Sequence, residues 1–388
     1  MMLVACGEDR TYEYQEKTEP NHYMQSLMQE WYLWGDSLQD LTWGDYFAVP
    51  NDFVKKLAAQ SPQGDNWSYC SIDTVNQDYH PRATFSCHDS YGMDLVLMTD
   101  PTGETTKQYA RVVSVYPDSP AERCGIRRND FISQMDHVKM SKSTITKLTS
   151  GIGRTLIVNR IKGNADGTLA WASTDTLTIS HSEKVDVPQI MVKKMIASHV
   201  AYIMITQLND IEPIYSALES LLTSNLDQLI IDFRLCNQGT LETVIDVARL
   251  IANHQGDFIH TKWNSHKSMN DAQYAFEANC SSDIFFITSQ YTQGAAEWLI
   301  HAMQTDEGHR VVKVGQTTAG QNVMLHEIPT PYYYTLHAAV AFVGDGDDNY
   351  GYSEGIAPDI EVDEMTYAML YPYGDEREVL ISTILENY

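Results

Sequence analysis

The stretch from Ile284 to Leu299 has a layout that can present a reactive side chain above the edge of a sheet. Residues 284–287 are apolar and predict a buried strand, a polar turn follows, and a helix is expected to begin near Ala295. A side chain on such a turn projects above the strand end, and the helix N-terminus behind it favours negative charge. This layout is typical of a turn that carries a nucleophile, so we take it as the chemical centre of the chain.

Two further segments are expected to meet this turn. Residues 229–234 predict a second buried strand, which runs into the turn 235–239 and then a helix. Residues 311–315 predict a third strand, which runs into 316–321. Together the three segments resemble the core of the tail-specific, or C-terminal processing, serine peptidases. The resemblance implies an α/β core of the ClpP/crotonase type.

The resemblance also implies a serine–lysine catalytic pair, in which a lysine kept neutral by burial activates the serine hydroxyl. The family's turn reads like SASASE, and Glu297 sets the register here, so the serine position falls on Gly294. The family's lysine follows a glycine after a V-G-x-x-T strand end, and that position falls on Gln321. The backbone amides of Gly239 and Ala295 fall where the family holds the oxyanion.

Three catalytic elements of the resembled family are therefore degraded in this chain. Gly294 has no side chain with which to attack, and the amide of Gln321 has no useful basicity at neutral pH. The turn 235–239 keeps one glycine, whereas Asp232 and Arg234 before it are retained. We expect a scaffold without its catalytic pair.

Relocation of the catalytic pair is the alternative. Thr292 and Ser289 lie near the same turn and could supply a hydroxyl. Lys313 lies on the predicted strand 311–315, before the loop that holds Gln321, and is the candidate base. Cys236 could place a thiol near the oxyanion site, although a buried structural cysteine is the commoner outcome.

The composition excludes some function classes. The chain of 388 residues has a formal net charge of −26, which argues against nucleic-acid binding because phosphates would be repelled. Its length allows two or three domains. The 13 histidines form no HExxH or other compact ligand spacing, so we predict no metal and no cofactor.

The N-terminus suggests a lipid anchor. Leu3-Val4-Ala5-Cys6-Gly7 matches the bacterial lipobox, in which the cysteine is lipidated, although the charged and apolar regions of a signal peptide are missing upstream. We predict an envelope protein anchored through Cys6, followed by an unstructured polar linker over residues 8–20. A chance match is the alternative.

Between the linker and the core, two smaller regions are expected. Helices are predicted over residues 23–40 and 51–60 as a helical cap. The run 116–132 resembles a PDZ domain, with a short helix opened by Pro120 and ended by Gly125. The loop that captures a peptide carboxylate in such domains falls on Tyr91, Gly92 and Met93. Asp94 next to this loop would weaken capture, and a domain that only supports its neighbour is the alternative.

From residue 199 onwards, strands and helices alternate, which predicts an α/β layered domain with a largely parallel sheet. The tail Gly355-Ile356-Ala357-Pro358-Asp359 resembles the family's terminal element. The fold class is therefore a multidomain α/β protein. The predicted divisions are a lipobox and linker (1–19), a helical cap (20–84), a PDZ-like domain (85–182), a peptidase-like core (192–365) and a C-terminal helical extension (366–388).

Three functions follow from these residues. The first is an inactive peptidase homologue that binds peptides or unfolded C-termini. The second is a working serine-type endopeptidase that uses Thr292 or Ser289. The third is a scaffold that assembles partners through the PDZ-like region.

Overall fold

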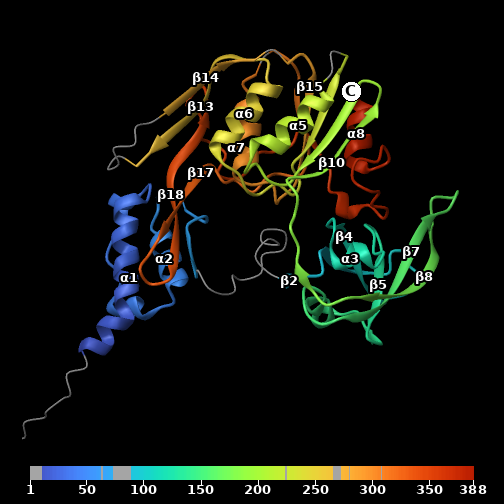
Figure 1. Cartoon of the computed structure of the whole chain (residues 1–388), viewed down its shortest axis with the longest axis horizontal. Coiled ribbons are helices and arrows are strands. Elements are labelled where there is room, and N and C mark those ends of the chain that lie inside the picture. Colours follow the sequence, from blue (N-terminus) through green and yellow to red (C-terminus); the bar gives the residue numbers. More distant parts are fainter. Residues whose placement is uncertain are drawn as a thin grey trace, which may run out of the picture. The chain divides into compact units, whose positions relative to one another are not determined.

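The computed structural model describes residues 11–62, 64–72, 89–222, 225–264, 272–278, 280–306 and 308–388. The predicted lipobox with Cys6 lies outside these residues. The described chain forms two compact units. The first takes its residues from 1–78, 257–275 and 321–351, and the second from 79–256, 276–320 and 352–388. Figure 1 labels many of the elements of both units.

The first unit combines a helical region with an antiparallel sheet. Its helices are α1 (Thr11–Trp31), η1 (Gly35–Ser37), η2 (Trp43–Phe47) and α2 (Pro50–Ala58). The sheet has the order β1-β18-β13-β14, with β17 paired to β18. Its strands are β1 (Tyr69–Ile72), β13 (Gln255–Trp263), β14 (Ala272–Glu277), β17 (Val323–Pro329) and β18 (Tyr334–Asp345). Apolar side chains of α1, α2 and β18 share one core, which includes Met28, Phe53 and Leu336.

The predicted linker is wrong over residues 11–20, because α1 already begins at Thr11. The exposed residues 14–17 are Tyr, Gln, Glu and Lys, and the last three are good helix formers. The helix is also anchored by Asn21, whose side-chain amide donates to the carbonyls of Tyr46 and Ala48, both at 2.8 Å. The predicted helix over 23–40 ends early at Trp31, whereas the helix predicted over 51–60 is confirmed as α2, with Pro50 in its first turn.

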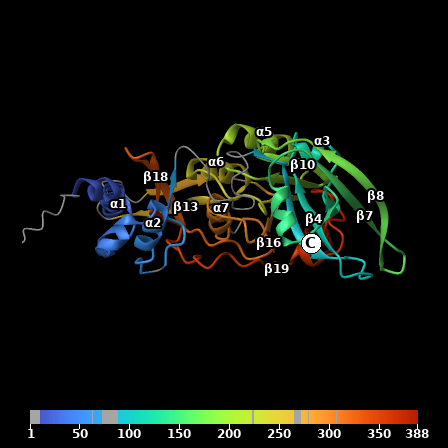
Figure 2. The ribbon, with the colours of Figure 1, turned by 90° about the horizontal axis from the view of Figure 1, so that it is seen from below.

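The second unit begins with a β-rich region, residues 89–184. Its main sheet has the order β3-β4-β5-β7-β8, with β6 paired to β5, and a small second sheet pairs β2 with β9. Strands β7 and β8 form a long hairpin that extends away from the other strands (Figure 2). The bounds are β2 (Asp89–Ser90), β3 (Met93–Thr99), β4 (Gln108–Val115), α3 (Pro120–Arg123), β5 (Phe131–Met135), β6 (Val138–Lys139), α4 (Lys142–Ile145), η3 (Thr146–Leu148), β7 (Arg154–Gly163), β8 (Leu169–Ile179) and β9 (Glu183–Lys184).

The rest of the second unit is a layered α/β core around the sheet β10-β11-β12-β15-β16-β19. All neighbouring strands are parallel except β10, which runs antiparallel to β11. The bounds are β10 (Ile190–Ala197), β11 (Val200–Ile205), α5 (Ile211–Leu221), β12 (Gln228–Asp232), α6 (Leu241–Ile251), β15 (Asp283–Thr288), α7 (Ala295–Met303), β16 (Val311–Gly315), β19 (Ile360–Glu361), η4 (Glu364–Thr366) and α8 (Val379–Asn387).

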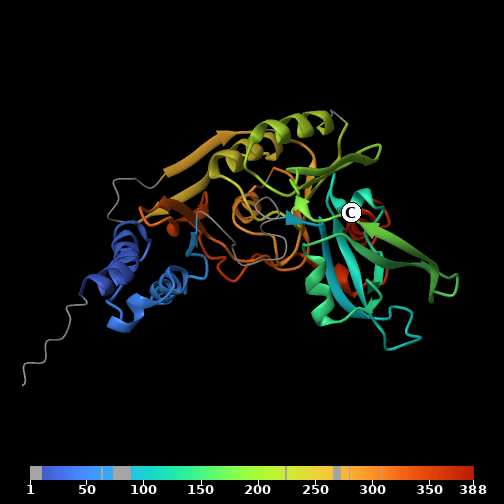
Figure 3. The same cartoon turned by 60° about the horizontal axis from the view of Figure 1, so that its bottom comes forward.

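Helices cover both faces of this parallel sheet. The C-terminal helix α8 packs its Leu380, Ile381 and Ile384 against Ile230 and Phe285 of the strands. Helices α5, α6 and α7 lie together on the other face (Figures 1 and 3). Strands buried on both faces explain the continuous apolar runs of the sequence. Within the described residues, we find no helix with the length and apolar character that a membrane crossing requires.

Candidate functional site

The predicted nucleophile turn joins β15 to α7 at the carboxyl edge of the parallel sheet. β15 ends at Thr288 and α7 begins at Ala295, as the sequence predicts. Gly294 occupies the N-cap of the helix with φ 59° and ψ −115°. Residues other than glycine rarely adopt this conformation, and strained residues of this kind cluster at catalytic sites. The elbow that would present a nucleophile is therefore formed, with a glycine at its apex.

Glu297 fixes this elbow to the loop that follows β16. Its side chain is fully buried, and Oε2 accepts the Gly294 N–H at 3.0 Å. Oε1 accepts the Gly320 N–H at 2.6 Å and a hydrogen bond from the Thr318 hydroxyl. In the sequence, Glu297 indicates only the register of the turn, because no local pattern reports its contacts with Thr318 and Gly320.

The two hydroxyls proposed as relocated nucleophiles are engaged in holding the turn. Thr292 Oγ1 donates to the carbonyl of Phe233 at 3.0 Å and accepts the Ser289 N–H at 2.9 Å. Ser289 Oγ donates to the carbonyl of Arg234 at 2.7 Å and accepts the Tyr291 N–H at 3.0 Å. Both side chains are buried. Each hydroxyl hydrogen points to a backbone carbonyl, which is a structural role.

The predicted base positions also have partners. Lys313 lies on β16 and is buried, and its Nζ lies 3.0 Å from Asp359 Oδ2. This ion pair engages the amine of Lys313 with a carboxylate and gives it a structural partner. Gln321 directly follows Gly320 in the chain, and its side-chain amide donates to the carbonyl of Val323 at 3.2 Å.

The predicted oxyanion positions lie next to each other. A Cβ placed on Gly239 would lie 2.5 Å from the Cβ of Ala295 and 2.6 Å from that of Leu208, so only glycine fits. The Gln293 N–H donates to the carbonyl of Cys236 at 2.9 Å and ties the two turns together. Burial raises the pKa of the Cys236 thiol, which therefore stays protonated at neutral pH.

Two family models match the chain. Peptidase family S41 matches residues 199–362, and the peptidase S41 N-terminal domain matches residues 19–69. The chain belongs to peptidase family S41. The predicted family of tail-specific peptidases and the predicted α/β fold class are thereby confirmed.

Solved structures share the fold of this S41 chain. A putative S41 protease from Bacteroides fragilis superposes with a TM-score of 0.82 at 21% identity, covering 94% of this chain and 96% of that one. The photosystem II D1 C-terminal processing protease gives a TM-score of 0.53 at 16% identity, covering 95% and 97%. Comparison with curated proteins gives no significant match.

Replacing Thr292 by valine should destabilise the S41 turn, because the isosteric side chain loses both hydrogen bonds and leaves the Ser289 N–H without its acceptor. We expect a loss of about 1–3 kcal/mol in the free energy of unfolding, measured by urea titration. Thr305→Val is the matched control, since its hydroxyl bonds one carbonyl, that of Ala302, at 2.8 Å. Equal stabilities of the two variants would contradict a bracing role for Thr292.

The loop predicted to capture a peptide carboxylate uses two of its amides internally. The Tyr91 N–H donates to the carbonyl of Thr149 at 3.2 Å, and the Gly92 N–H donates to Ser90 Oγ at 2.9 Å. Met93 begins β3. Asp94 is buried and accepts a hydrogen bond from the Tyr116 hydroxyl at 2.9 Å, so its carboxylate points into the domain.

A substitution at Gly92 tests how tightly this loop is packed. Its φ is 75°, and a Cβ there would lie 2.1 Å from the Cβ of Ser119. Gly103 has φ 74° with nothing within 4 Å of an added Cβ. Because both alanine variants carry the same backbone strain, Gly92→Ala should lower the melting temperature well below that of Gly103→Ala. Equal melting temperatures of the two variants would show that the loop accommodates the added methyl group at Gly92 without loss of stability.

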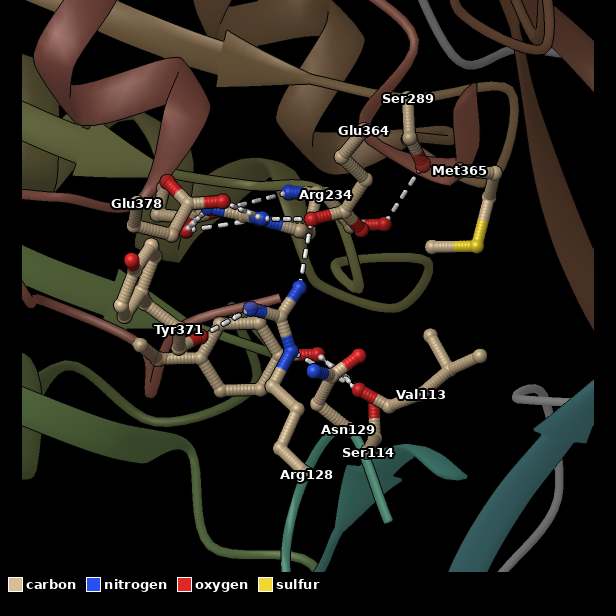
Figure 4. Close-up of polar contacts among 12 residues, drawn as sticks. Val113, Ser114, Arg128, Asn129, Arg234, Ser289, Glu364, Met365, Tyr371 and Glu378 are labelled. Atoms are coloured by element: carbon tan, nitrogen blue, oxygen red, sulfur yellow. Dashed lines mark hydrogen bonds and ion pairs between the residues drawn. The ribbon is translucent and has the colours of Figure 1, made fainter. Parts of the chain in front are cut away.

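A buried network of ion pairs connects the β-rich region to the core of the S41 chain (Figure 4). Arg234, at the end of β12, places Nη2 2.6 Å from Asp232 Oδ2 and Nη1 2.8 Å from Glu378 Oε1. Glu364 accepts from both Arg234 and Arg128, and Arg128 belongs to the β-rich region. The sequence points to Asp232 and Arg234, but it does not indicate the distant partners Glu364 and Glu378.

An aromatic ring completes this network. The ring of Tyr373 faces both guanidinium groups. Its centroid lies 4.2 Å from Cζ of Arg128 and 5.0 Å from Cζ of Arg234. Its hydroxyl is hydrogen-bonded to that of Ser114 on β4 at 2.6 Å. Cation–π contact and paired carboxylates together compensate the burial of two guanidinium groups. Because the Arg234 carbonyl also accepts from Ser289, the network extends to the nucleophile turn.

Proposed function

We propose that this chain is a catalytically inactive member of family S41 that binds peptides or unfolded protein C-termini. The observation that carries the proposal is the glycine at the apex of the strand–turn–helix elbow. Gly294 holds the backbone conformation of the elbow, and Glu297 braces it, yet the position has no atom that could attack a carbonyl.

The engagement of the remaining hydroxyls and amine supports inactivity over a relocated pair. Thr292 and Ser289 donate their hydroxyl hydrogens to the carbonyls of Phe233 and Arg234. A nucleophile needs a base within hydrogen-bond reach of its proton, and a backbone carbonyl is not one. Lys313 is paired with Asp359.

The free edge of strand β3 supports peptide binding. β3 pairs with β4 on one side and ends the order of its sheet among the described strands. An extended peptide can add to such an edge as a further strand, held by main-chain hydrogen bonds. Because the Tyr91 and Gly92 amides are used internally, this mode depends on the strand edge more than on a terminal carboxylate. A scaffold that gathers partners at this edge is the second candidate function.

We further propose that the protein acts in the bacterial cell envelope, lipid-anchored through Cys6. The support is the sequence Leu3-Val4-Ala5-Cys6-Gly7. Metabolic labelling with a palmitate analogue should tag the wild-type chain and leave Cys6→Ser untagged when both are made in a bacterium with a lipoprotein pathway. Equal labelling of the two would reject the anchor.

The test of binding uses the full chain and fluorescent peptides with apolar C-termini, read by anisotropy and followed by mass spectrometry of the recovered peptide. We expect saturable binding with the peptide intact, and similar affinity for free and amidated C-termini. Absence of binding across the panel would contradict the proposal.

Two substitutions of exposed valines test whether the peptide binds at the edge of β3. Val96 on β3 is 41% exposed, and Val138 on β6 is 56% exposed. A strand added to β3 would place a side chain beside Val96, so Val96→Glu should weaken binding by up to about fivefold, in line with cross-strand pair energies of roughly 0.2–1 kcal/mol. Val138→Glu should bind as the wild type does. Equal affinities of the two variants would reject the β3 edge as the binding surface.

A further inference from the structure

Three aromatic side chains form a cluster on the helical region of the first unit. The ring of Phe47 lies in the middle, with its centroid 6.0 Å from that of Tyr14 and 5.5 Å from that of Trp43, both in edge-to-face geometry. Tyr14 lies near the N-terminus of α1, whereas Trp43 and Phe47 are the first and last residues of η2. We call Tyr14, Trp43 and Phe47 the aromatic cluster.

The aromatic cluster is exposed to solvent. Trp43 is 63% exposed, and Tyr14 and Phe47 are also exposed. Tyr46, which lies between the other two aromatic residues of η2, is instead buried in the core of the unit. Single exposed apolar residues are common on proteins, but contiguous apolar patches mark interaction sites. Because the three rings contact one another, they form such a patch.

The backbone that carries the cluster is fixed by buried and local hydrogen bonds. The side-chain amide of Asn21 on α1 donates to the carbonyls of Tyr46 and Ala48, both at 2.8 Å, and so holds the end of η2 against the helix. At the start of η2, Asp45 Oδ2 accepts the Thr42 N–H at 3.0 Å and the Thr42 hydroxyl at 2.6 Å. A patch fixed in this way loses little conformational freedom when it binds.

The charge of the region does not favour an anionic partner. The carboxylate within η2, that of Asp45, is compensated by an ion pair with Lys56 of α2. The chain as a whole has a formal net charge of −26, which repels anionic surfaces. Binding at the aromatic cluster therefore depends on its apolar rings, and an uncharged partner fits it best.

The aromatic cluster lies close in the sequence to the proposed lipid anchor. Cys6 precedes Thr11, the first residue of α1, by five positions, and five residues of extended chain span at most about 17 Å. Tyr14 lies one helical turn after the start of α1. A lipid on Cys6 would therefore keep this end of α1, and the aromatic cluster with it, near the surface of a bilayer.

We propose that the aromatic cluster docks on the uncharged headgroup region of a lipid bilayer and orients the anchored protein there. Tryptophan and tyrosine suit the interface between membrane and water, because their rings are apolar while the indole N–H and the phenolic hydroxyl keep polar contacts. The inference rests on the lipid anchor proposed at Cys6, which brings the bilayer within reach. It adds a contact surface that the lipobox does not indicate.

The test separates this surface from the anchor by using the full chain with Cys6→Ser, which cannot be lipidated. The chain is mixed with phosphatidylcholine vesicles whose acyl chains carry bromine, a quencher of nearby tryptophan, and bound protein is measured by vesicle flotation. We expect saturable binding with quenched fluorescence, and no weakening when the salt concentration is raised. Absence of flotation would overturn the docking surface, whereas the labelling of Cys6 decides the anchor separately.

Trp43→Ser in the Cys6→Ser chain tests the largest ring of the cluster. Trp43 is the exposed one among the seven tryptophans, all of which the structure describes, so the quenching should disappear with it. Because apolar burial contributes in proportion to area, vesicle binding should weaken about tenfold or more. Circular dichroism should show an unchanged fold, since the side chain is exposed. Undiminished binding would contradict the proposal.

Two tyrosines with equal exposure give a matched pair. Tyr14 on α1 and Tyr215 on α5 are both 44% exposed and both lie on helices. In the Cys6→Ser chain, Tyr14→Ser should weaken vesicle binding about threefold or more, because it removes part of the aromatic cluster. Tyr215→Ser should bind as its parent does. Equal effects of the two substitutions would show that the vesicles do not select the cluster.

A second copy of the chain is another occupant that an exposed apolar patch can have. Light scattering without vesicles measures the mass of the Cys6→Ser chain with and without Trp43→Ser. We expect the same mass for both chains. A dimer that Trp43→Ser dissociates, together with vesicle binding that the substitution leaves unchanged, would assign the cluster to a subunit contact and overturn the proposal.

Discussion

Replacing Arg234 by leucine is expected to remove about 3–5 kcal/mol from the free energy of unfolding, the range typical when one partner of a buried ion pair is lost. The guanidinium is 1% exposed and compensates three carboxylates, those of Asp232, Glu364 and Glu378. Without it, Asp232 and Glu378 remain buried with no counter-charge from this side chain. Urea unfolding followed by circular dichroism measures the loss.

Arg249→Leu is the matched control for this prediction. Arg249 lies on α6 and pairs with Asp246 at 2.7 Å, but its side chain is 51% exposed. Exposed pairs of this kind contribute little, so we expect a change below about 1 kcal/mol. A similar effect of both variants would mean that burial of the Arg234 network contributes nothing beyond an ordinary surface pair.

Restoring serine at Gly294 together with lysine at Gln321 is expected to create peptidase activity. The serine hydroxyl would stand at the apex of the braced elbow, and Gly239, whose amide falls on the family's oxyanion position, packs against Ala295. Because a positioned base contributes roughly 10²–10⁴-fold, the double variant should cleave unfolded casein at least about 10²-fold faster than Gly294→Ser alone. The readout is release of casein fragments, quantified by mass spectrometry.

The serine should also have a measurable cost in stability. At φ 59° and ψ −115° a side chain is strained, which costs about 1–3 kcal/mol. Gly294→Ala carries the same strain without a hydroxyl and is the control for both readouts. A folded double variant that cleaves no faster than Gly294→Ala with Gln321→Lys would contradict the assignment of these two positions.

Local sequence patterns were sufficient for the elements of the parallel core. The apolar run at 284–287 lies within β15, the run at 229–233 overlaps β12 except for its first residue, and α7 begins where the sequence predicts. Strands buried on both faces and helices opened by polar turns leave signals within a few residues. The β-rich region was found for the same reason, since Pro120 and Gly125 delimit α3.

Long-range partners left no such signal. Arg234 meets Glu364 and Glu378, which are 130 and 144 positions away in the chain. No local periodicity reports a contact at that separation. The antiparallel sheet of β1, β13, β14, β17 and β18 was missed because it assembles strands from three distant parts of the sequence.

The central proposal is that this chain keeps the S41 fold without a working nucleophile. The most direct measurement is incubation of the purified wild-type chain with unfolded casein and a serine-directed fluorophosphonate, with intact-mass analysis of both proteins. We predict intact casein and no covalent adduct on the chain. Casein fragments together with an adduct on Thr292 or Ser289 would contradict the claim and would establish a relocated nucleophile.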